Sequence, residues 1–127
     1  MSPAFWLALG LAGSLGAIAR FGVSYWMLQW FGRDFPWGTL LVNILGSFLM
    51  GFFAVYLLSK LHWSEPMRIV VLTGFLGAFT TFSAFSVDAL FLIEREAWLR
   101  AIFYVTASVL FALLATRGGM VLAERML

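Results

Sequence analysis

The sequence predicts an all-α membrane protein with four transmembrane helices, the third of which is broken in mid-membrane. Of its 127 residues, 63% are apolar and only 11% are charged, and the mean hydropathy is +0.98. Soluble domains carry about 25% charged residues. The apolar runs are each about 20 residues or longer, the length that crosses a bilayer. We therefore expect one domain over residues 1–127, with spans at about 4–31, 37–61, 66–93 and 97–120.

The first span carries small residues and one arginine. Ser2 suits the N-cap, and Pro3 suits the first helical position, where its missing amide hydrogen costs nothing. Glycines at positions 10, 13 and 16 give a flat face on which another helix can pack closely. Arg20 costs about 2.5 to 3.5 kcal/mol in hydrocarbon, so we expect it to face water, a partner or a vestibule, or to snorkel to the interface.

The second and fourth spans each carry a stripe of polar or small residues at four-residue steps, which places each stripe on one helix face. Asn43 is the strongest hydrogen-bonding group of the second span. Such stripes commonly serve hydrogen bonding between helices. The second-span stripe is Thr39, Asn43, Ser47 and Gly51, and the fourth-span stripe is Tyr104, Ser108, Ala112 and Thr116.

The third span contains the stretch around which the chain is organised, from Thr73 to Asp88. It holds two glycines, three threonines, two serines and four phenylalanines. Glycine allows backbone conformations outside the helix. Serine and threonine hydroxyls can form hydrogen bonds with the backbone amides and carbonyls that lose their helical partners. We expect a break over residues 77–81, which is either a packing kink or a site where unwound carbonyls coordinate a cation.

Just beyond the expected break, Phe82 and Phe85 share one helix face, and each is followed by a serine. They either pack as ordinary aromatic residues or turn their positive ring edges toward a dehydrated anion. Asn43 can donate amide hydrogens to the same anion. Asp88 lies on the same face, as a partner for Arg20 or as a vestibule residue.

The distribution of basic residues favours neither orientation of the chain in the membrane. Four basic residues fall on the side of the termini and three fall on the opposite side, with Arg20 left out because it lies within a span. We therefore expect insertion in both orientations and an antiparallel homodimer, whose interface would also cover the polar stripes.

Other function classes find little support. The chain has no cysteine, one histidine in a loop and no catalytic motif, so an enzyme is not expected. The net charge is +2, but no basic patch could hold a nucleic acid.

Together these residues resemble the Fluc (CrcB) family of small bacterial fluoride channels over essentially the whole chain. Each short motif alone is weak evidence for this resemblance, whereas all four motifs in this order are specific to the family. They are Gly13-x-x-Gly16-Ala17-x-x-Arg20-Phe21, Gly38-Thr39-Leu40-x-Val42-Asn43, Thr73-Gly74-Phe75-Leu76-Gly77-x-x-Thr80-Thr81-Phe82-Ser83-x-Phe85-Ser86, and the Tyr-Ser stripe of the fourth span.

The resemblance implies a fluoride-selective passive channel of the bacterial inner membrane, with two pores in a dual-topology antiparallel homodimer. It implies a structural sodium ion held by main-chain carbonyls of Gly77 and Thr80, and a vestibule that contains Arg20. We expect the anion pathway to be lined by Asn43, Thr81, Phe82, Ser83, Phe85, Tyr104, Ser108 and Thr116.

Two residues depart from the family pattern. Ala112 stands where serine is common, and Asp88 stands where glutamate is common. Two other functions stay open, an exporter of organic cations and a structural assembly subunit. The exporter would need a membrane-embedded carboxylate, and the first span offers Arg20 instead.

Overall fold

The computed structural model describes residues 1–127 and consists of helices joined by short connections. The first span is α1 (Pro3–Phe31), the second is α2 (Trp37–Ser59) and the fourth is α6 (Trp98–Arg125). The third span, Glu65–Glu94, is divided into α3 (Glu65–Ile69), the π-helix η1 (Val70–Leu76), α4 (Gly77–Phe79) and α5 (Phe82–Glu94).

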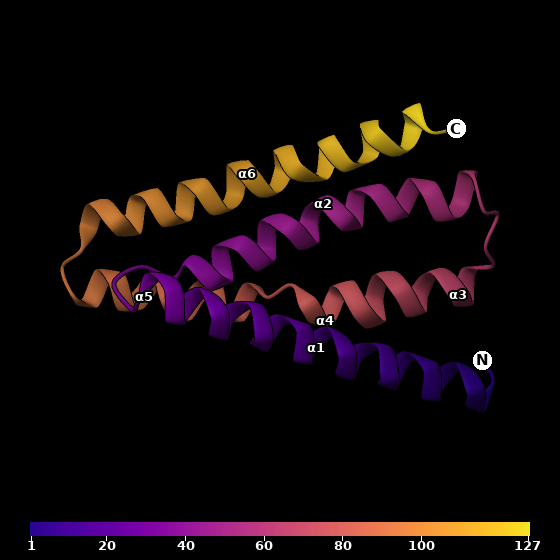
Figure 1. The fold of residues 1–127 in the computed structure, drawn as a ribbon, viewed down its shortest axis with the longest axis horizontal. Coiled ribbons are helices and arrows are strands. Elements are labelled where there is room, and N and C mark those ends of the chain that lie inside the picture. The colour runs from indigo at the N-terminus through magenta and orange to yellow at the C-terminus, as the bar shows by residue number, and fades with distance from the viewer.

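The structure confirms the prediction of four membrane spans. All four helical segments, 23 to 30 residues long, are long and apolar enough to cross a membrane, so the chain is a multi-pass membrane protein. Both termini lie at one end of the bundle together with the α2–α3 connection (Figure 1). The α1–α2 and α5–α6 connections lie at the other end. Only 19 of the 127 residues are buried, so much apolar surface is left for lipid or a partner to cover.

The ends of two spans differ from the predicted ones. Helix α2 ends at Ser59 rather than at residue 61, and α6 continues to Arg125 rather than ending near residue 120. The glycine pair at 118 and 119 does not end α6, because Gly119 packs against the α2 backbone. A Cβ atom built on Gly119 would lie 2.1 Å from the carbonyl oxygen of Phe48.

The break in the third span is shorter than predicted. Gly77 is helical, with φ −63° and ψ −36°, and α4 continues to Phe79. Only Thr80 (φ −79°, ψ 159°) and Thr81 (φ −154°, ψ 117°) are extended. The preceding turn is retained because both the amide and the hydroxyl of Thr80 donate to the carbonyl oxygen of Leu76, each at 3.0 Å.

Glycines bring the third span close to α1. A Cβ atom on Gly16 would lie 2.2 Å from the carbonyl oxygen of Phe75, so only glycine permits this approach. The main buried cluster lies at the end opposite the termini and joins α2, α5 and α6 around Tyr104, which is fully buried. Through these contacts, the break in the third span is held in place beside α1 and α2.

Candidate functional site

Asn43 of α2 bridges the break in the third span. Its Nδ2 donates to the carbonyl oxygen of Thr81 at 2.9 Å, and its Oδ1 accepts from the amide of Thr81 at 2.8 Å. One side-chain amide thus serves both backbone groups of a residue that has left the helix. The extended backbone can therefore persist at this depth, where unsatisfied polar groups are costly.

Thr81 also begins the second half of the span as the N-cap of α5. Its Oγ1 accepts from the amide of Ala84 at 3.1 Å and lies 3.3 Å from the hydroxyl of Ser83. A threonine hydroxyl at this position satisfies one of the free amides at the start of a helix. Thr81 and Ser83 therefore meet at the break, as two residues of the predicted pathway.

The same contacts leave two carbonyl groups without their helical donors. The amide of Thr81, which would serve the Gly77 carbonyl in a continuous helix, bonds to Asn43 instead. The amide of Ala84, which would serve the Thr80 carbonyl, bonds to the Thr81 hydroxyl. Free carbonyl oxygens are ligands that suit a hard cation, so this backbone fits the expected sodium ion. No group of three His, Cys, Asp or Glu side chains offers a metal site elsewhere.

The predicted aromatic residues form a chain of contacts from the break toward Asp88. The ring centroids of Phe82 and Phe85 are 5.4 Å apart, and those of Phe85 and Tyr104 are 5.3 Å apart. The hydroxyl of Tyr104 donates to Oδ2 of Asp88 at 3.2 Å. The side chain of Phe82 is 78% exposed, whereas Tyr104 is buried. The structure thus brings four residues of α5 and α6 into one row.

Arg20 lies beside the break and does not pair with Asp88. The only ion pair of the chain joins Arg117 and Glu124. Arg20 and Thr81 line a cavity of about 250 Å³, together with residues of α1, α2 and α5. The Nε atom of Arg20 is buried and has no hydrogen-bond partner. The pairing of Arg20 with Asp88, one of the two alternatives for the carboxylate, is therefore wrong.

The two remaining hydroxyls of the fourth span do not join this group within one chain. Ser108 is buried and its Oγ has no partner. The Thr116 hydroxyl donates to the carbonyl oxygen of Ala112 in its own helix at 2.9 Å. Tyr104 and Thr116 are 12 residues apart on α6, so they are separated by about 18 Å along the helix axis.

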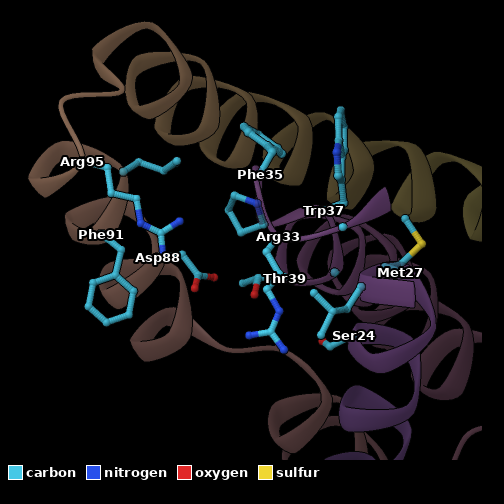
Figure 2. Close-up of a pocket in the computed structure, with 14 residues that line it drawn as sticks. Ser24, Met27, Arg33, Phe35, Trp37, Thr39, Asp88, Phe91 and Arg95 are labelled. Atoms are coloured by element: carbon cyan, nitrogen blue, oxygen red, sulfur yellow. The ribbon is translucent and has the colours of Figure 1, made fainter. Parts of the chain in front are cut away.

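A second cavity of about 280 Å³ opens between the two connections at the end opposite the termini. Figure 2 shows the side chains of Ser24, Arg33, Thr39, Asp88 and Arg95 around this cavity. Sequence reasoning did not place Ser24, Arg33 and Arg95 at a common cavity. The two arginines are near the ends of spans, but nothing in their spacing shows that the two connections converge.

The comparisons with known proteins agree with the motif resemblance. Residues 7–120 match the family model described as CrcB-like protein, Camphor Resistance (CrcB). The chain is 46% identical over 120 residues to a "Fluoride-specific ion channel FluC" of Rhizobium meliloti (strain 1021), with 94% of this chain and 96% of the relative covered.

Two further relatives carry the same name. The protein of Hahella chejuensis (strain KCTC 2396) is 41% identical over 127 residues, which is the full length of both chains. The protein of Saccharophagus degradans (strain 2-40) is 46% identical over 123 residues, with 95% of this chain and 90% of the relative covered. Because the match extends over nearly the whole chain and includes the break and its flanks, the chain belongs to the CrcB-like protein family.

Proposed function

We propose that the chain is a passive, fluoride-selective ion channel that lets fluoride leave the bacterial cytoplasm down its gradient. The observation that carries the proposal is the identity of 41 to 46%, over nearly the full length, to bacterial proteins named fluoride-specific ion channels. The site agrees with this function, since it gathers neutral hydrogen-bond donors, aromatic edges and one arginine around a break in a membrane span.

The channel works as an antiparallel dual-topology homodimer with two pores. In a single chain the third span leaves Phe82, Ser83 and Gly77 exposed near the middle of the membrane. Polar groups at this depth favour contact with another helix over contact with lipid. A second copy in the opposite orientation would cover this face, and the nearly equal charges of the two ends permit both orientations.

Each fluoride passes through a path lined by ring edges and hydroxyl or amide donors. The positive edges of Phe82 and Phe85 attract an anion that has lost part of its hydration shell. Asn43 uses one amide hydrogen on Thr81, and its second hydrogen is left for the anion. Ser83, Thr81, Tyr104, Ser108 and Thr116 supply hydroxyls to the same path. When they donate to an ion, Thr116 must release the carbonyl of Ala112 and Tyr104 must release the carboxylate of Asp88.

A sodium ion would be held by the main-chain carbonyls of Gly77 and Thr80 from both subunits. When bound, sodium supplies a fixed positive charge that offsets the negative ends of these unpaired carbonyl dipoles. The support for this role is the loss of the two helical donors at the break. Its function is structural, and the ion is not transported.

The proposal is tested with purified protein in liposomes that are loaded with potassium fluoride. After valinomycin is added, efflux is followed with a fluoride electrode, and vesicles loaded with potassium chloride serve as the selectivity control. We expect rapid fluoride efflux without chloride efflux. A monodisperse, folded protein that releases no fluoride would rule out the channel.

A further inference from the structure

Two neighbouring cavities lie between the end of the bundle opposite the termini and the break in the third span. The outer cavity, of about 280 Å³, lies beneath the α1–α2 and α5–α6 connections. The inner cavity, of about 250 Å³, reaches Arg20 and Thr81 at the break. They share two lining residues, Ser24 of α1 and Thr39 of α2. Ser24 and Thr39 therefore lie between the cavity at the connections and the cavity at the broken backbone, and we call the two cavities together the passage.

The charges along this passage are strongly biased toward one sign. Arg33 and Arg95 line the outer cavity, Arg20 lines the inner one, and Asp88 is the only carboxylate in either. None of the three arginines forms an ion pair, since the single ion pair of the chain joins two residues of α6. The acidic side chains of the neighbouring connections, Asp34, Glu94 and Glu96, do not line the passage.

We propose that Arg33 and Arg95 form an anion-concentrating entrance, which holds small hydrated anions in the outer cavity before they pass Ser24 and Thr39. This inference rests on the proposed channel function and adds an outer site to the arginine at the break. The side chains of both arginines point into the cavity in Figure 2, one from each connection. Because the cavity is open and both arginines are exposed, they act by electrostatic attraction over the width of the cavity rather than by tight binding.

The expected effect follows from the charge that is removed. A unit charge about 7 Å from an ion in a water-like medium changes the local ion concentration about threefold at low salt. Removing both arginines should therefore lower conductance by about five- to tenfold when access to the pore is limiting. Added salt at about 1 M reduces the Debye length to about 3 Å, so the difference should then fall below about twofold.

The experiment is a planar bilayer recording at symmetric fluoride of about 10 mM, with and without an impermeant salt such as potassium isethionate at about 1 M. The test variant is R33Q/R95Q. Conductance near zero voltage depends on all resistances in series, so it does not depend on which way the protein inserts. R33K/R95K should keep the wild-type conductance, because lysine retains the charge. R100Q is the matched control, because Arg100 lies at the same end but lines neither cavity.

Each outcome supports or overturns the entrance. A salt-sensitive loss in R33Q/R95Q, absent in R100Q, supports it. Equal conductance of R33Q/R95Q and wild type at low salt overturns it, as does a loss that persists unchanged at high salt. If R33Q/R95Q does not fold, the wild-type protein provides the test. An equal wild-type conductance with and without the impermeant salt then overturns the entrance. The recordings are made in neutral phosphatidylcholine and repeated with phosphatidylglycerol. A loss of conductance that appears only with phosphatidylglycerol means that the arginines act on acidic lipid, and it also overturns the proposal. A wild-type protein without any fluoride current contradicts the channel function itself.

Discussion

Replacing Asn43 with alanine removes both hydrogen bonds that hold the broken backbone of the third span. These bonds, at 2.8 and 2.9 Å, serve the amide and the carbonyl of Thr81. Hydrogen bonds between membrane helices contribute about 0.6 to 1.7 kcal/mol each, so the pair contributes about 1 to 3 kcal/mol. The equilibrium for opening the break should then rise between about 5- and 150-fold.

Hydrogen exchange of the purified protein in lipid nanodiscs measures this opening. In Asn43→Ala we expect faster exchange at the amide of Thr81, which loses its acceptor, while the amides of α6 keep their wild-type rates. Ser47→Ala is the matched control, because Ser47 lies one helical turn further along α2 and forms no side-chain hydrogen bond. Unchanged exchange at Thr81 in Asn43→Ala would refute the role of Asn43 as the support of the break.

Three further predictions concern packing, the aromatic pair and the cation. Gly119→Ala should lower stability by about 1 to 3 kcal/mol in thermal denaturation in detergent, because its Cβ would lie 2.1 Å from the Phe48 carbonyl oxygen. Gly10→Ala, whose Cβ meets nothing within 4 Å, should not lower stability, and equal losses in both variants would contradict this explanation. Phe82→Ile and Phe85→Ile should each abolish fluoride efflux and leave the elution volume unchanged, because isoleucine keeps the bulk but has no ring edge; intact efflux in both variants would disprove the aromatic pathway. Exchange of sodium for a larger monovalent cation during purification should lower efflux, and indifference to the exchange would count against the structural sodium ion.

The sequence was sufficient to predict the four spans because each is a separate apolar run bounded by charged or turn-forming residues. The break was also predictable, since glycine and paired threonines are unusual within an apolar helix. Its length was not, because Gly77 can adopt either a helical or an extended conformation. The length of the break depended on which of the following residues found hydrogen-bond partners on α2. Asn43 supplies such partners for Thr81 alone.

The site was predictable where its residues share one element and unpredictable where elements converge. Phe82 and Phe85 are three residues apart on one helix, so their contact followed from helical spacing. The hydrogen bond between Tyr104 and Asp88 depends on how α5 packs against α6, which no local pattern records. The same limit explains why the alternative that paired Arg20 with Asp88 was wrong.

The π-helix Val70–Leu76 determines which way the rest of the third span faces. A π turn holds more residues than an α turn, so a helix that passes through one is rotated relative to a regular α-helix of the same length. Each residue of an α-helix advances it by about 100°. Deletion of one residue between Val70 and Leu76 could therefore restore α-helical winding and leave every helix–helix contact before it intact. Because the looser winding of the π-helix takes up about one extra residue, the threonines and phenylalanines beyond it would then keep nearly the same direction toward α2. The π-helix is therefore the part of the third span that could lose a single codon without misdirecting the site, whereas the same loss in a regular α-helical part would turn the site by about 100°.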